Sequence, residues 1–209
     1  GQYEAGLITR KELNTVEDLA CPTCGSCAGM YTANTMNCLT EALGMGLPGN
    51  GTVPAVFSER LRLAKKAGMQ ILEILKADLR PSDIMTKKAF ENAVAVDMAL
   101  GGSSNTALHL PAIAHEAGVD LTLDDFNDIA KKTPQLCKLS PSGEYFIEDL
   151  YRAGGVTGVM KRLYENGRLN ADEKTVALRT QGELAKDAYI NDDDVIKPWD
   201  KPAYTTGGI

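Results

Sequence analysis

Apolar residues recur at three- and four-residue intervals through much of this chain, and glycine or proline ends each run. The clearest run lies between Met30 and Leu47, with Gly49 and Gly51 directly after it. This spacing places the apolar side chains on one face of an α-helix. The chain is therefore expected to fold as a series of helices that pack their apolar faces into a shared core.

The same spacing predicts further helices, each with its own start or stop signal. Their approximate ranges are 13–19, 52–79, 86–100, 103–118, 122–133 and 159–164. Thr52 with Pro54 is expected to open the second of these, and Ser103 or Ser104 is expected to cap the helix that follows the double glycine. Short strands are expected at 135–139 and 176–178. The predicted fold class is therefore α/β and helix-rich.

The composition is that of a soluble globular protein, with 44% hydrophobic and 24% charged residues among 209. No apolar run is long enough to cross a bilayer, and the first residues lack the apolar core of a signal peptide. The net charge is −6 and the basic residues are dispersed, so neither a membrane nor nucleic acid is an expected partner. Because the chain begins at Gly1 and stops at Ile209 just after a turn-like segment, we expect a fragment of a longer protein.

Three cysteines, Cys21, Cys24 and Cys27, stand within seven residues in the run CPTCGSCAGM. Thiolates bind zinc, copper(I) and iron–sulfur centres, and a thiolate at a helix start is favoured by the unpaired N–H groups there. Five cysteines, an odd number, do not suggest a secreted disulfide scaffold, so a reducing intracellular compartment is expected. The motif therefore predicts a metal centre.

Two other uses of these cysteines remain open. A structural zinc site needs four ligands, usually in two pairs, and the second pair is missing because Cys38 and Cys137 lie among apolar residues and are predicted to be buried. A redox-active C-x-x-C pair lacks the strand that usually precedes it. An iron–sulfur cluster accounts for the motif better, because its ligands can come from distant segments. Cys27 is the strongest candidate ligand, since the small residues Ala28 and Gly29 follow it.

Four segments of the chain resemble the dihydroxy-acid dehydratases, within the wider group that includes sugar-acid and phosphogluconate dehydratases. They are CPTCGSCAGMYTANTMNCLTEALGMGLPGNGT at 21–52, AFENAVAVDMALGGSSNTALHL at 89–110, PQLCKLSPSG at 134–143 and YRAGGVTGVM at 151–160. The residues Ala-Gly-Met-Tyr-Thr-Ala-Asn after Cys27 are similar to the dihydroxy-acid branch. A sugar-acid or phosphogluconate dehydratase, and a cysteine–metal interaction module, are the alternatives.

This resemblance implies the dehydration of 2,3-dihydroxy-3-methyl carboxylic acids to 2-oxo acids in valine and isoleucine biosynthesis. It implies an iron–sulfur cluster, of the 2Fe-2S or 4Fe-4S type, as Lewis acid, and an assisting Mg²⁺. Cys27 is the one cluster ligand carried over, while the Mg²⁺ ligands and the catalytic base are expected outside this chain. The implied enzyme is a homodimer, cytoplasmic in bacteria and archaea and organellar in eukaryotes.

The resemblance also implies that residues 1–209 are the central and C-terminal portion of an N-terminal α/β domain. The boundary to a missing β-rich C-terminal domain is expected near 205–209. Cys24 either lies beside the cluster or only packs. Asn34 and the bend with Ser103, Ser104 and Asn105 either face the cluster or substrate, or serve as buried and capping residues.

Overall fold

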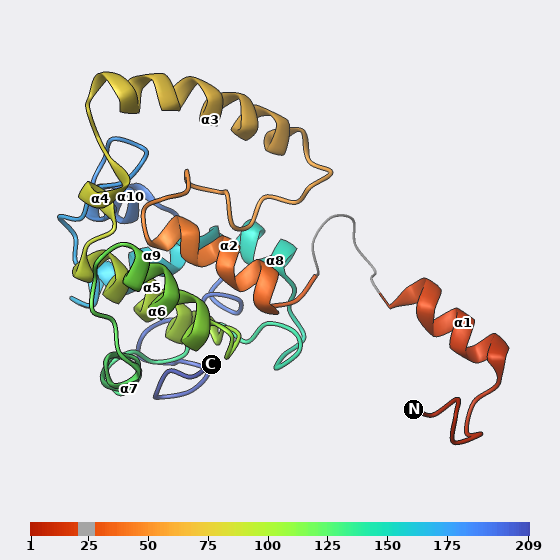
Figure 1. Ribbon diagram of the computed structural model, residues 1–209. Helices are drawn as coiled ribbons and strands as arrows, with labels where there is room; N and C mark the ends of the chain where they lie inside the picture. The colour runs from red at the N-terminus through yellow and green to blue at the C-terminus, as the bar shows by residue number, and fades with distance from the viewer. Residues whose placement is uncertain (21–27) are drawn as a thin grey trace.

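Ten α-helices form the regular structure of the residues that the computed structural model describes, 1–20 and 28–209 (Figure 1). They are α1 (Arg10–Leu19), α2 (Thr32–Ala42), α3 (Ser58–Lys76), α4 (Pro81–Ile84), α5 (Lys87–Leu100), α6 (Thr106–Glu116), α7 (Leu123–Ala130), α8 (Ile147–Ala153), α9 (Gly155–Glu165) and α10 (Gln181–Asp187). The predicted helix-rich architecture is confirmed. None of the helices in this described part has both the length and the apolar character needed to cross a membrane.

Helix α5 forms the centre of the fold. Eleven of its residues are buried, and it packs against α2, α6, α7 and α9. Thr86 caps the helix start by accepting a hydrogen bond from Ala89 N at its hydroxyl, 3.1 Å away. Gly101 ends the helix in the left-handed conformation, with φ of 67°. The predicted range 86–100 is therefore confirmed, and it fixes the positions of the elements on either side.

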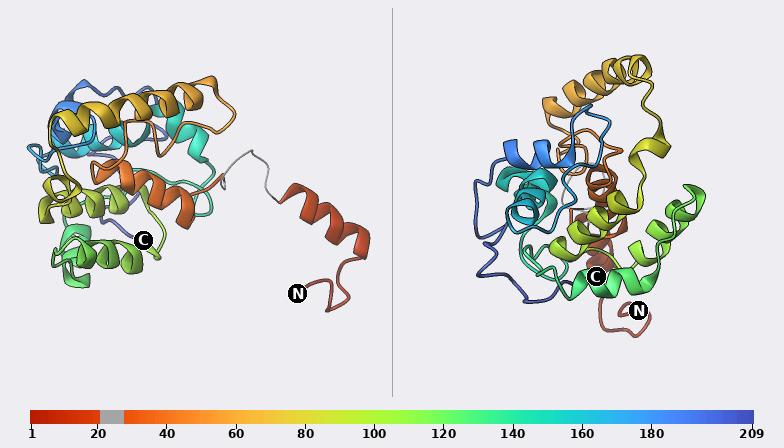
Figure 2. Two further views of the ribbon diagram at one scale, coloured as in Figure 1. Left: turned by 45° about the horizontal axis from the view of Figure 1, so that its top comes forward. Right: turned by 90° about the vertical axis from the view of Figure 1, so that its left-hand side faces the viewer.

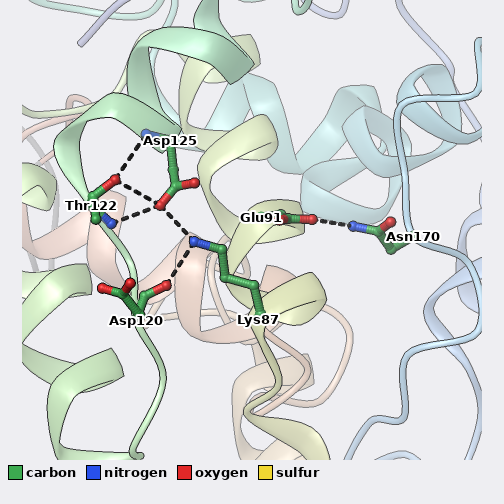
Figure 3. Close-up of polar contacts among 6 residues, drawn as sticks. All are labelled: Lys87, Glu91, Asp120, Thr122, Asp125 and Asn170. Atoms are coloured by element: carbon green, nitrogen blue, oxygen red, sulfur yellow. Dashed lines mark hydrogen bonds and ion pairs between the residues drawn. The ribbon is translucent and has the colours of Figure 1, made fainter.

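A lysine at the start of α5 joins this central helix to α7 (Figure 3). Lys87 Nζ donates to Asp125 Oδ2 at 2.6 Å and to the backbone oxygen of Asp120 at 2.7 Å. The same Asp125 oxygen accepts from the backbone N–H and the hydroxyl of Thr122. One carboxylate thus completes the α7 capping box and holds the loop before α7 against α5.

Helix α3 lies along the outer edge of the molecule in every view and buries none of its residues (Figures 1 and 2). Its contacts with the body lie on one side. The Arg60 guanidinium donates to Asn50 O at 3.1 and 3.2 Å, and Gln70 Nε2 donates to Val176 O at 2.9 Å. The expected helix start at Thr52 is wrong, because Arg60 binds the carbonyls of the preceding loop and the helix begins at Ser58.

The two expected strands do not form. At 135–139, the backbone N–H groups of Leu136 and Cys137 both donate to Ala99 O, at 2.8 and 3.0 Å, and so bind the end of α5 instead of a neighbouring strand. At 176–178, Val176 N donates to Gly44 O at 2.8 Å. Extended backbone in the described residues is paired only at isolated bridges, such as Gln135 with Tyr204. These segments therefore act as connectors between helices.

Candidate functional site

Three polar side chains meet where α2 and α6 begin. Asn105 Nδ2 donates to Thr32 Oγ1 at 2.8 Å and to Ser103 Oγ at 3.1 Å, and the two hydroxyl oxygens lie 3.3 Å apart. Thr32 is the first residue of α2, and Asn105 is the N-cap residue of α6. We call these three residues the polar cluster. It joins the helix that follows the cysteine motif to the glycine–serine–asparagine bend.

The structure corrects the predicted cap of α6. Neither Ser103 nor Ser104 occupies the N-cap position, which belongs to Asn105. The Asn105 side chain makes no capping hydrogen bond, and its Nδ2 donates to the polar cluster. Ser104 is exposed on the outside of the bend. Of the predicted residues, Ser103 and Asn105 come together, and Thr32 is the partner that the sequence did not identify.

The bend itself is shaped by a double glycine over a buried carboxyl. A Cβ on Gly102 would lie 2.0 Å from Asp97 Oδ1, so no larger residue fits there. The backbone N–H groups of Gly101 and Gly102 donate to Asp97 O, and Ser103 N donates to Thr35 Oγ1 at 3.2 Å. These contacts fix the backbone of the bend and therefore the orientation of the Ser103 side chain.

Asp97 is fully buried beneath this bend. Neither carboxyl oxygen has a hydrogen-bond partner among the described residues. Loss of hydration raises the pKa of the carboxyl to about 7, because the charged form has lost its contact with water. A protonated, uncharged carboxyl is therefore well populated at neutral pH.

Residues 28–34, directly after the cysteine motif, are fixed by backbone contacts. Ile147 N donates to Ala28 O at 2.8 Å, and Met30 N donates to Ser140 O at 2.7 Å. Asn34 is buried and donates from Nδ2 to Gly29 O at 2.7 Å. Its amide thus holds the backbone two residues after Cys27, while a role of Asn34 toward the cluster or the substrate stays a prediction.

A cavity of about 250 Å³ lies beside Ala28. Its polar wall is made by Asn34, Asn37, Asn50, Thr52, Arg60 and Glu148. Glu41 holds the loop that forms one side of the cavity, because its Oε2 accepts a hydrogen bond from Gly51 N at 3.0 Å. Burial raises the pKa of Glu41 to about 7. The cavity and the polar cluster lie on two neighbouring parts of the segment that follows Cys27.

Cys21, Cys24 and Cys27 lie outside the described residues. The other two cysteines, Cys38 and Cys137, are free thiols and fully buried, as predicted. Burial raises the pKa of Cys137 to about 12 and that of Cys38 well above its ordinary value, so both remain protonated at neutral pH. Neither thiol is suited to bind a metal.

Residues 1–184 match the family described as Dihydroxy-acid/6-phosphogluconate dehydratase N-terminal. The chain belongs to this family. Over all of its 209 residues it is 60% identical to a dihydroxy-acid dehydratase of Caldanaerobacter subterraneus subsp. tengcongensis and 59% identical to one of Pyrococcus abyssi. A third dihydroxy-acid dehydratase, from Caldicellulosiruptor saccharolyticus, is 60% identical. The chain spans 38% of the length of each of these relatives.

The described residues do not form a metal site by themselves. Within 1–20 and 28–209, no three cysteine, histidine, aspartate or glutamate side chains come together as a metal ion would require. A cluster or a magnesium ion would therefore need ligands from the cysteine motif and from the longer polypeptide that the relatives possess. The described residues fit the supporting part of such a site.

Asp97, Glu41 and Arg60 are residues of this region that the sequence analysis did not identify. The amino-acid sequence does contain a pattern that indicates that Asp97 and Glu41 are buried. Asp97 is the one charged residue between Glu91 and the double glycine, and Glu41 is the one charged residue in the apolar run from Met30 to Leu47. A single acid in an apolar helical pattern indicates a buried carboxyl, and such groups are frequent at functional sites.

Proposed function

We propose that this chain is the part of a dihydroxy-acid dehydratase that contributes Cys27 to an iron–sulfur cluster. The observation that carries the proposal is the 55–60% identity to proteins of that name over the full 209 residues. The residues after Cys27 support it, because the chain there is similar to the dihydroxy-acid branch. The proposed substrates are 2,3-dihydroxy-3-methyl carboxylic acids, which give the 2-oxo acids that precede valine and isoleucine.

The proposed reaction removes one water molecule without a change in oxidation state. The proton on C2 leaves to a base, the 3-hydroxyl leaves with its electron pair, and the resulting enol takes a proton at C3 and loses the proton of its 2-hydroxyl to become the 2-oxo acid. Hydroxide is a poor leaving group, so a bound cluster, of the 2Fe-2S or 4Fe-4S type, would supply a Lewis acid at the 3-hydroxyl. Mg²⁺ would assist at the carboxylate end, with ligands from outside this chain.

The described residues would hold the chain around Cys27 in place. Ala28, Gly29 and Met30 are bound to the segment 140–147 and to Asn34, so the backbone that follows the thiolate is fixed. A Cβ on Gly29 would lie 2.6 Å from Ser140 O, which keeps this packing specific for glycine. The polar cluster and the cavity beside Ala28 would face the reaction space with hydroxyl and amide groups.

The wider context follows from the same proposal. Residues 1–209 would be the central and C-terminal portion of an N-terminal domain, with the boundary to a second domain near 205–209. The full-length enzyme would act as a homodimer on a small-molecule substrate without nucleic acid or membrane partners. In bacteria and archaea it would be cytoplasmic, and in eukaryotes organellar.

A substrate panel on the full-length, cluster-loaded enzyme tests the proposal. We expect 2,3-dihydroxy-3-methylbutanoate to be converted to its 2-oxo acid, detected as the phenylhydrazone, at a kcat/KM at least about 100-fold above those for 6-phosphogluconate and a sugar acid. Preference for either of the latter would move the enzyme to the other branches of the family. No turnover, together with stoichiometric zinc whose removal unfolds the chain, would identify an interaction module instead.

A further inference from the structure

One side of α3 has an apolar stripe, formed by Leu61, Ala64, Gly68, Ile71, Leu72 and Leu75, of which Ala64 and Ile71 also line the cavity between α3 and the body. The spacing 61, 64, 68, 71, 75 alternates three and four residues, which is the pattern of a helix that packs along a partner helix. Leu61 is 76% exposed, and Leu75 is 75% exposed. We call this set the α3 stripe. Arg60 and Gln70, which anchor α3 to the body, line the same cavity as Ala64 and Ile71, so this edge of the stripe borders the body and the edge with Leu61 and Leu72 faces solvent.

Gly68 lies at the middle of the α3 stripe. Glycine weakens a helix interior relative to alanine, so its presence calls for a reason. The described part of the chain supplies none, because a Cβ on Gly68 would meet no atom within 4 Å. A glycine on an exposed helix face permits the backbone of a second helix to come close. The missing side chain therefore indicates a partner outside the residues described.

The α3 stripe is symmetric about this glycine. Leu61 precedes Gly68 by seven residues and Leu75 follows it by seven, while Ala64 and Leu72 lie four residues on either side. Two antiparallel copies of α3 that cross at Gly68 would place Leu61 of one against Leu75 of the other. A two-fold axis requires such a self-complementary surface, in which residue i meets residue j and j meets i.

The exposed area fits a dimer contact. The four large side chains of the α3 stripe, each more than half exposed, offer on the order of 400 Å² of apolar surface per copy. A standard interface buries about 800 Å² per partner, a little over half of it apolar. We propose that α3 pairs with α3 of a second copy of this chain and forms the centre of the homodimer contact. This inference rests on the homodimer of the proposed function and identifies its surface.

A cross-link at the two-fold axis tests this pairing in the full-length enzyme. In Gly68→Cys, the two introduced thiols would face each other, so a short bis-maleimide should join most of the protein into covalent dimers. The matched control is Lys66→Cys, which is also exposed but lies on the opposite side of α3. It should give no more covalent dimer than the unsubstituted enzyme. A Gly68→Cys yield equal to that of the control overturns the proposal.

A second variant measures how strongly the α3 stripe contributes to the free energy of dimerisation. Leu75→Lys places two charges in the pairing per dimer, so the dimer dissociation constant should rise by at least roughly 100-fold in sedimentation equilibrium. An unchanged dissociation constant, or a stable monomer that loses unfolding free energy, would show that another part of the same polypeptide covers α3. Turnover of the dihydroxy acid by the unsubstituted enzyme tests the proposed function, and its outcome does not depend on which surface forms the dimer.

Discussion

Asp97 is a buried carboxyl whose charge state should set part of the pH dependence of stability. Its pKa rises from 3.8 to about 7 on folding, so the folded protein keeps a proton that the unfolded chain releases. The contribution of the protonated Asp97 carboxyl to the unfolding free energy is complete below its unfolded pKa of 3.8, and it is lost as pH rises through its folded pKa of about 7. The Asp97→Asn variant has an uncharged amide in place of this carboxyl, so it has no proton to release over this pH range. Between about pH 4 and pH 8, the wild type should therefore lose on the order of 4 kcal/mol relative to the variant.

Denaturant unfolding of the full-length enzyme at each pH measures this difference. Glu41 also has a pKa near 7, but it is present in both proteins and cancels in the comparison. The matched control is Asp124→Asn, an exposed carboxyl in the first turn of α7. Parallel stability curves for wild type and Asp97→Asn would rule out a raised Asp97 pKa.

At the residue scale, the sequence singled out the glycine–serine–asparagine bend but not all of the side chains that meet there. Ser103 and Asn105 were predicted and do meet, because the double glycine forces a tight bend. Thr32, their third partner, is 71 residues before Ser103 and could be placed there only by the packing of α2 against α6. The local sequence predicts which side chains lie at a bend, whereas tertiary packing determines which distant residues they contact.

At the element scale, the Lys87–Asp125 ion pair should contribute modestly to stability. Both side chains are partly exposed, at 39% and 29%, so Lys87→Met should cost about 1 kcal/mol of unfolding free energy. The hydrogen bond from Lys87 lowers the pKa of Asp125 more than any other contact, so this contribution is present at neutral pH and is lost as pH falls through that lowered pKa. Hydrogen exchange should become faster in the first turn of α7.

The neighbouring exposed residue provides the matched control. Lys88→Met removes the same charge and similar atoms without breaking an ion pair, so it should leave both stability and α7 exchange nearly unchanged. Equal effects of the two substitutions would mean that net charge, and not the link between α5 and α7, accounts for the loss.

Helices with local signals were predictable. Thr86 and Thr122 stand at the predicted starts of their helices and cap them, because the capping hydroxyl and the N–H that it accepts from are three residues apart. Pro54 failed as a helix start because Arg60, six residues later, binds the loop carbonyl of Asn50. The segment 135–139 failed as a strand because its N–H groups bind Ala99, at the end of α5. Both failures come from hydrogen bonds over a longer range than the local pattern shows.

At the scale of the whole molecule, the described residues form a helical body without a metal site of their own. The helices fix the backbone at 28–30 and place two polar surfaces, the cavity and the polar cluster, along the segment 28–34. The relatives it matches are more than twice its length, so the remaining ligands are proposed to come from the longer polypeptide. The central claim is that Cys27 joins this helical body to the cluster.

Iron content and dehydration rate of the full-length enzyme with Cys27→Ser test this claim most directly. We predict loss of the cluster absorbance and at least a roughly 100-fold fall in the dehydration of the dihydroxy acid, because one of the few cluster thiolates is removed. Cys38→Ala, which removes a buried protonated thiol, should retain both iron and activity. A Cys27→Ser enzyme with full iron content and an undiminished rate would contradict the account.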